Sequence, residues 1–139
     1  MAGLYQGGRV DVVAGPALGG IIMAYEVARG LGVRNIFAER ENGKMTFRRG
    51  FHVNPGERVL VVEDVVTTGG SGREVIGLLR ETGAEVAGVG AGVDRSGGSV
   101  DFGVPFRPLM CMEARKWEES ECPLCREGIP IDKPGSRAV

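Results

Sequence analysis

Short apolar segments alternate along the chain with longer segments that have helical character. The almost wholly apolar run "VDVVA" is typical of a strand buried on both faces of a parallel sheet. Residues 21–31 predict a helix that ends at Gly32, and residues 73–81 predict a second helix, with an apolar stripe and a stop at Gly83. The same pattern predicts five strands, at residues 10–14, 35–40, 59–63, 85–93 and 106–112.

The connecting segments are polar or rich in small residues. The sequence "GPALGG", residues 15–20, predicts a turn, and "MTF" and "FHV" within the polar residues 41–58 predict a hairpin. Alternating strands and helices predict an α/β fold, a doubly wound and mostly parallel sheet flanked by helices, with ligands at the carboxyl ends of its strands. A chain of 139 residues suits a single domain, here with an irregular Cys/Pro-rich tail from about residue 117.

Composition and charge exclude several classes of partner. The net charge is -1 and no basic block is present, which argues against nucleic acid as the main partner. No apolar run reaches the ~18 residues that a membrane span needs, and the start of the chain lacks a signal-peptide pattern. Three cysteines do not make a disulfide framework, so we expect a cytoplasmic, reducing location.

The most informative segment is "VLVVEDVVTTGGSGRE", residues 59–74, where a buried strand leads into a loop of small residues before a helix. Such a loop is a natural phosphate cradle, because backbone amides converge, glycines allow close approach and the helix dipole favours an anion. The loop is neither a Walker A sequence nor a GxGxxG motif. We therefore predict a phosphate site at five residues, namely Thr67, Thr68, Gly69, Gly70 and Ser71.

Two adjacent acids, Glu63 and Asp64, end the strand that precedes this loop. Carboxylates repel phosphate, so they must face another part of the ligand, such as sugar hydroxyls met directly or through Mg²⁺. A sugar phosphate satisfies both the acids and the loop. The alternative is a strand that ends in solvated acids, followed by a helix with Ser71 as its N-cap.

The thirteen residues "VLVVEDVVTTGGS" closely resemble the phosphoribosyl pyrophosphate (PRPP) signature of type I phosphoribosyltransferases. The resemblance implies the type I core fold. It further implies that Glu63 and Asp64 act in catalysis by holding the ribose hydroxyls, and hold Mg²⁺ indirectly or through PRPP. Residues 67–71 would bind the 5′-phosphate.

Three further segments extend the resemblance, the first to the family's pyrophosphate loop and the other two to orotate phosphoribosyltransferases. In "GPALGG", the residues Ala17, Leu18 and Gly19 would form the pyrophosphate loop, although a simple turn is the alternative. "AERENGKMTFRRGF", residues 38–51, is similar to the mobile catalytic segment, with Arg40 and Lys44 as candidate cations; the alternative is a solvated hairpin.

The third segment, "VGAGVDRSGG", would place Arg95 against the orotate carboxylate, with a local salt bridge as the alternative. The closing "CPLCREGIPIDKPGSR" also resembles one orotate subgroup, so the similarity runs from about residue 10 to residue 137. It implies a Mg²⁺-dependent transfer from PRPP to orotate, in a homodimer. The alternatives are transfer to another base, or a PRPP-binding module without turnover.

The sequence departs from the family in two respects. Leu18 or Gly19 stands where the pyrophosphate loop usually has a lysine. The first predicted strand begins about nine residues into the chain, so we expect no helix, lid or subdomain before it, whereas orotate enzymes carry an N-terminal hood over the base. On this ground we expect PRPP binding with poor orotate turnover.

Cys122 and Cys125 form a CxxC pair, a spacing found in zinc knuckles. Zinc would need a second pair of ligands, for which the chain offers Cys111 and His52, unless two subunits share the site. A redox pair and inert thiols are the other interpretations. We expect His52 to be a surface residue of the hairpin.

Overall fold

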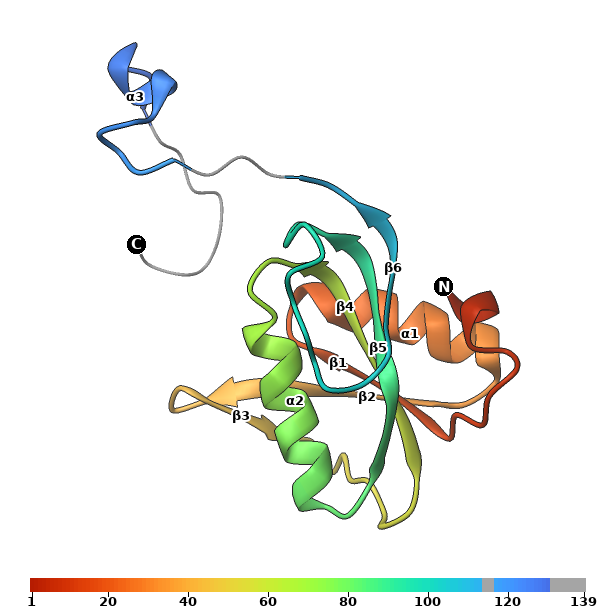
Figure 1. The fold of residues 1–139 in the computed structure, drawn as a ribbon. Helices are drawn as coiled ribbons and strands as arrows, with labels where there is room; N and C mark the ends of the chain where they lie inside the picture. Colours follow the sequence, from red (N-terminus) through yellow and green to blue (C-terminus); the bar gives the residue numbers. More distant parts are fainter. Residues whose placement is uncertain (114–116, 131–139) are drawn as a thin grey trace.

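A computed structural model describes residues 1–113 and 117–130, and the described residues form a six-stranded sheet between helices (Figure 1). The strand order is β3-β2-β1-β4-β5-β6, and only the β2–β3 pair is antiparallel. The strands are β1 (Val12–Pro16), β2 (Arg34–Glu41), β3 (Lys44–Phe47), β4 (Arg58–Val66), β5 (Glu85–Asp94) and β6 (Phe106–Cys111). The helices are η1 (Ala2–Leu4), α1 (Gly19–Leu31), α2 (Gly70–Glu81) and α3 (Pro123–Arg126).

Helices α1 and α2 cover opposite faces of the sheet (Figure 1). Side chains alternate along each strand, so one set packs with α1 and the other with α2. Val13, Leu60 and Val62 belong to the core under α1, whereas Val12, Ala14, Val59 and Val61 belong to the core under α2. The apolar runs of β1 and β4 therefore reflect burial on both faces, which confirms the predicted doubly wound, mostly parallel sheet.

The predicted element boundaries need correction at the carboxyl ends of the strands. β1 continues to Pro16 and β4 to Val66, so both strands reach further than residues 10–14 and 59–63. Helix α1 begins at Gly19, inside the predicted turn, and α2 begins at Gly70 rather than at residue 73. The N-cap of α2 is Gly69 and not Ser71. Helix and strand thus approach each other across very short connections.

The hairpin prediction paired the wrong segments. β3 pairs antiparallel with the end of β2, with Glu41 opposite Lys44, while residues 51–53 form no strand. The turn consists of Asn42 and Gly43, which both have positive φ, 51° and 81°. Asn-Gly is the preferred pair for such a two-residue hairpin turn, so the signal was present in the sequence but was overlooked.

Both ends of the described chain contain a short helix that the sequence pattern did not predict. At the N-terminus η1 precedes Tyr5, whose hydroxyl donates a 2.9 Å hydrogen bond to the Val89 carbonyl and anchors this segment to the sheet. In the tail, α3 forms one helical turn where we predicted irregular structure. No helix among the described residues is long and apolar enough to cross a membrane.

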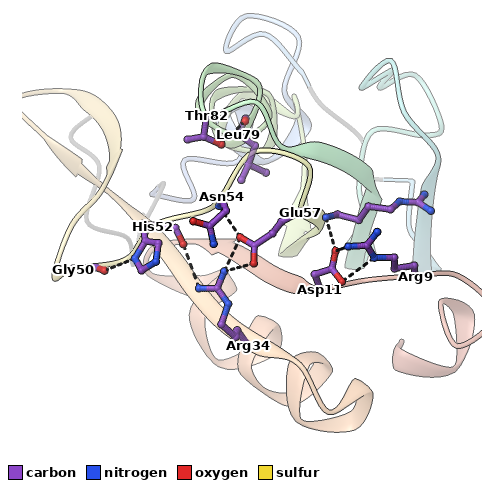
Figure 2. A network of polar contacts seen from close by, with 10 residues as sticks. Arg9, Asp11, Arg34, Gly50, His52, Asn54, Glu57, Leu79 and Thr82 are labelled. Atoms are coloured by element: carbon purple, nitrogen blue, oxygen red, sulfur yellow. Dashed lines mark hydrogen bonds and ion pairs between the residues drawn. The ribbon is translucent and has the colours of Figure 1, made fainter.

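A polar network ties together the amino ends of the strands (Figure 2). Arg34, at the start of β2, donates to both carboxylate oxygens of Glu57 at 2.7 Å. Asp11 accepts hydrogen bonds from the backbone N–H of Arg58 and from Arg9. The hydrogen bond from the backbone N–H of Asn54 holds the pKa of Glu57 below its usual range, and the hydrogen bonds from Arg34 lower it further. This network therefore lies at the amino ends of the strands, and ligands are expected at the opposite, carboxyl ends.

Gly15 sets the distance between β1 and the start of α1. A Cβ on Gly15 would lie 2.7 Å from the Gly20 carbonyl oxygen and 2.8 Å from the Ala24 Cβ. We predict that Gly15→Ala lowers the free energy of unfolding by about 1–3 kcal/mol, because the helix must move away. The control Gly77→Ala faces open space in α2 and should stabilise by about 0.5–1 kcal/mol. Urea denaturation that shows equal effects for both variants would contradict this packing.

Candidate functional site

A cavity of about 710 Å³ opens at the carboxyl ends of β1 and β4. These strands are neighbours, but the chain leaves β1 toward β2 and leaves β4 toward β5, on the other side. Ligands of open α/β sheets bind at such a reversal of strand order. The cavity is lined by Pro16, Ala17, Leu18, Gly19, Gly20, Glu39, Arg40, Glu63, Asp64, Val65, Val66, Thr67, Thr68, Gly69, Gly70, Ser71 and Glu74.

Most of the predicted site residues meet in this cavity. The exceptions are Lys44 and Arg95, which do not line it. Lys44 is exposed at the first position of β3, and Arg95 is exposed just after β5. The other predicted residues come from the loops after β1 and β4, from β2 and from the acid pair. They are Ala17, Leu18, Gly19, Arg40, Glu63, Asp64, Thr67, Thr68, Gly69, Gly70 and Ser71.

The two acids lie at different depths at the end of β4. Glu63 is buried with 7% of its surface exposed, while Asp64 is half-buried. Strand alternation sends successive side chains to opposite faces, and the Asp64 carboxylate lies against Gly19, where any Cβ would overlap it. Asp64 also accepts a 2.8 Å hydrogen bond from the N–H of Val65. The acid pair therefore sits between the loop after β1 and the loop after β4.

The loop after β4 leads directly into the N-terminus of α2. Gly69 has φ +74°, a conformation that a side chain would strain, and Gly70 is the first helical residue. The first amide groups of a helix have no partner within the helix, and the helix dipole makes this end positive. The positive end of a helix of 12 residues thus faces the loop for which the sequence predicts an anion site.

The loop after β1 forms the opposite wall of the cavity. Its Ala17 N–H donates a 2.7 Å hydrogen bond to the Ala38 carbonyl, which continues the β1–β2 pairing, and the peptide bond between Ala17 and Leu18 is cis. The Leu18 side chain is 77% exposed. This loop therefore offers an exposed apolar side chain, backbone groups and small residues to a ligand.

Arg40 is held at the mouth of the cavity by two contacts. Its guanidinium donates to the Glu74 carboxylate at 2.6 Å and to the Gly43 carbonyl at 2.9 Å. The arginine therefore links the β2–β3 hairpin to helix α2. Glu74 was missed by the sequence reasoning, although it follows Gly70 by four residues and so shares its helix face.

The charge of the lining is negative. Among the described lining residues there are four carboxylates and one guanidinium. Glu39 is paired with Arg49 and Arg48, whose side chains are 62% and 46% exposed, and Glu74 is paired with Arg40. Carboxylates therefore outnumber guanidinium groups four to one among the described lining residues. A polyanionic ligand would be repelled here unless a cation accompanied it.

Arg95 follows a buried acid. Asp94 is 2% exposed and accepts a 2.8 Å hydrogen bond from the Ser96 N–H. Hydrogen bonding by Ser96 holds the pKa of Asp94 below its usual range. The backbone N–H of Arg95 donates to the carbonyl of Val66, a lining residue, at 2.8 Å. The turn that carries Arg95 is therefore fixed beside the cavity, with the side chain at the surface.

The cysteine pair and His52 lie outside this cavity. Cys122 is the N-cap of α3 and Cys125 lies within it. The backbone N–H and thiol of Cys125 lower the pKa of Cys122, and the hydrogen bond to Cys122 raises the pKa of Cys125. Within residues 1–113 and 117–130 no group of three or more His, Cys, Asp or Glu could hold a metal, so Cys111 and His52 do not complete a zinc site in one chain. His52 is exposed and contacts the Gly50 carbonyl at 3.2 Å (Figure 2).

Residues 2–101 match the phosphoribosyl transferase domain family. The whole chain is 62% identical to the orotate phosphoribosyltransferase of Caldanaerobacter subterraneus subsp. tengcongensis and covers 73% of that protein. Over 130 residues, 94% of the chain, it is 60% identical to the orotate phosphoribosyltransferase of Thermotoga maritima and 63% identical to that of Heliobacterium modesticaldum. It covers 70% and 68% of those two proteins.

Solved structures of the same fold are more distant in sequence. The adenine phosphoribosyltransferase of Thermoanaerobacter pseudethanolicus superimposes with a TM-score of 0.70 at 20% identity, over 80% of this chain and 75% of that one. The purine phosphoribosyltransferase of Pyrococcus horikoshii gives a TM-score of 0.65 at 24% identity, over 81% and 77%. At these identities the likeness establishes the fold.

The anion loop can be tested with a side chain at Gly70. A Cβ there would meet only the Thr68 hydroxyl, at 3.7 Å, so it would occupy the cavity without a clash. Gly69 is unsuitable, because its Cβ would strike Val100 at 2.7 Å and its φ is positive. We predict that Gly70→Val weakens ribose 5-phosphate binding at least about tenfold, since the side chain takes the ligand's place.

The matched control is Gly77→Val, which places the same side chain in the same helix, where nothing lies within 4 Å. Calorimetry should show unchanged affinity in this control and a loss in Gly70→Val. Equal affinity in both variants and the wild type would remove the loop from the site.

Proposed function

The chain belongs to the phosphoribosyltransferase family, within its orotate phosphoribosyltransferase branch, and we propose how its cavity carries out the transfer from PRPP to orotate. The products are orotidine 5′-monophosphate and pyrophosphate. One observation supports the roles proposed for these residues. The acid pair, the loop before α2 and the loop before α1 all line one cavity.

PRPP has a phosphate at one end of its ribose and a pyrophosphate at the other. The cavity likewise has one loop on each side of the acid pair, so each loop can take one of the two anionic groups. The loop of residues 67–71 takes the 5′-phosphate, because it leads into the N-terminus of α2. The loop of Ala17, Leu18 and Gly19 takes the pyrophosphate through backbone groups. Glu63 and Asp64 lie between them and face the ribose hydroxyls.

The donor set fits Mg²⁺ bound together with the substrate. Mg²⁺ is usually held by one or two carboxylates plus substrate phosphates, and the cavity offers Glu63 and Asp64 with an excess of negative charge. When bound, the ion would neutralise pyrophosphate oxygens and assist their departure. The acids would hold it through water or through PRPP, and without it the negative lining opposes binding of a polyanion.

The protein's own groups act on the charges that develop during transfer. The bond from the anomeric carbon to pyrophosphate breaks as a ring nitrogen of orotate attacks, and positive charge accumulates on the ribose. Glu63 and Asp64 would stabilise that charge in a partly buried setting. Arg40 would stabilise the departing pyrophosphate, for which it must exchange its Glu74 partner, 2.6 Å away, for a phosphate oxygen. Lys44 lies on the same hairpin and would approach only if the hairpin moves.

The proposal extends to the base, the assembly and the location. Arg95 would pair with the orotate carboxylate, supported by the fixed position of its backbone beside Val66. A homodimer and a cytoplasmic location are parts of the same proposal, the first testable by sedimentation of the purified chain. Transfer to another base is the competing function, and it is distinguished by offering adenine in place of orotate.

A spectrophotometric assay tests the proposed reaction. The loss of orotate absorbance should require the chain, PRPP and Mg²⁺ together, and adenine should not replace orotate. Asp64→Asn keeps an oxygen to accept the Val65 N–H, so it should fold normally while kcat/KM falls about a hundredfold through lost charge. If adenine but not orotate were converted, the proposed base would be wrong. Full activity in Asp64→Asn would contradict the role proposed for Asp64.

The assignment of Arg95 predicts a selective effect on orotate. Arg95→Ala removes a charged, two-pronged partner of a carboxylate, so the KM for orotate should rise about a hundredfold, equivalent to about 2–3 kcal/mol. The KM for PRPP should stay within about twofold. Arg107, which hydrogen-bonds the Leu4 carbonyl away from the cavity, provides the control Arg107→Ala. Equal losses for both substrates would show that Arg95 supports the fold instead.

A further inference from the structure

The side chain of Arg73, in the first turn of α2, connects two loops that are far apart in the sequence. Its guanidinium donates a 2.7 Å hydrogen bond to the Thr68 carbonyl. It also donates to the Asp101 carbonyl, from Nε at 3.3 Å and from the second terminal nitrogen at 3.1 Å. The guanidinium carbon lies 5.6 Å from the centre of the Phe102 ring. The guanidinium thus bridges the loop before α2, through Thr68, and the connection between β5 and β6, through Asp101.

The bond to Thr68 restricts the orientation of the loop. In a planar trans peptide the carbonyl and the next N–H point in opposite directions. When Arg73 holds the Thr68 carbonyl, the N–H of Gly69 must therefore point away from the guanidinium. Arg73 does not line the cavity, whereas Thr68 and Gly69 do. The arginine therefore acts from behind the loop, on the side away from the ligand.

Phe102 completes a support for the same segment. It is 5% exposed, and a Cβ on Gly69 or Gly72 would lie 3.1 Å or 2.9 Å from its ring. The loop that carries it is itself held, since the Asp101 carboxylate accepts a 2.7 Å hydrogen bond from the Gly103 N–H. Arg73 is therefore hydrogen-bonded to an ordered part of the connection between β5 and β6. Through its bond to Thr68 it restricts the position of the loop before α2.

We propose that Arg73 is a positioning residue for the 5′-phosphate: within the loop of residues 67–71 it holds the Thr68–Gly69 peptide so that the Gly69 N–H is turned toward the ligand. This inference rests on the proposed function, because it takes that loop to be the phosphate site. Pyrophosphate, assigned to the loop before α1, is outside its influence.

The inference predicts that the two anions respond differently to one substitution. In Arg73→Met, which keeps an unbranched side chain without the guanidinium donors, ribose 5-phosphate should bind at least about tenfold more weakly by calorimetry, on the order of one lost charge-assisted hydrogen bond. Pyrophosphate measured with Mg²⁺ should bind within about twofold of the wild type. In turnover, the KM for PRPP should rise more than kcat falls.

Arg73→Lys separates position from charge. A lysine keeps the positive charge but lacks the planar fork that reaches Thr68 and Asp101 together. We expect Arg73→Lys to remain closer to Arg73→Met than to the wild type in ribose 5-phosphate affinity. Full recovery by lysine would show that the charge alone matters, and would overturn the positioning role.

Arg80→Met is the matched control, because Arg80 is an exposed arginine two turns further along α2 and outside the cavity. It should leave both affinities unchanged. Unchanged ribose 5-phosphate affinity in Arg73→Met, or an equal loss for pyrophosphate, would overturn the inference while leaving the proposed function intact. If the wild type bound no ribose 5-phosphate, the phosphate site and the inference would both fall. If Arg73→Met failed to fold, Arg73→Lys would carry the same comparison of the two anions.

Discussion

The site depends on the parallel pairing of β1 with β4 at the centre of the sheet. Both strands are buried on both faces where they pair, from Val12 opposite Val59 to Ala14 opposite Val61, and the acids of β4 follow just beyond this pairing. There the two chains diverge in opposite directions, and the loops that follow are separated by the acid pair rather than by packed side chains. Glycines allow this convergence, since Gly15 admits the start of α1 and Gly19 leaves room for the Asp64 carboxylate. The hydrophobic core therefore determines where the chemistry can be located.

Charge determines what that position can bind. The lining combines four carboxylates with one guanidinium among the described residues, and Arg40 is already paired with Glu74. Such a cavity binds a polyanion only when cations accompany it and when backbone amides supply the remaining positive potential. The proposed reliance on Mg²⁺ and on the start of α2 follows from this balance. Under the same proposal, Glu74 would hold Arg40 until pyrophosphate competes for it.

The parts of the fold that follow from periodicity could be predicted from the sequence. Burial on both faces leaves a continuous apolar run, which revealed β1 and β4, and the acid pair with its small-residue loop had a recognisable order. Boundaries at the cavity were missed because glycines entered α1 and α2, whereas helix propensity places them outside. The β2–β3 hairpin was misassigned, although the pair Asn42–Gly43 is typical of a two-residue hairpin turn. Contacts between remote residues, such as Arg40 with Glu74 or Arg73 with Asp101, have no local signal, because only the folded sheet brings their elements together.

Amide chemical-shift mapping tests the central claim most directly, since that claim assigns two anions of one substrate to two loops. Ribose 5-phosphate added to ¹⁵N-labelled protein should shift the amide signals of residues 67–71, at the start of α2. Pyrophosphate with Mg²⁺ should instead shift those of Ala17, Leu18 and Gly19. Shifts of the same residues by both ligands, or shifts confined to residues outside the cavity, would contradict the account.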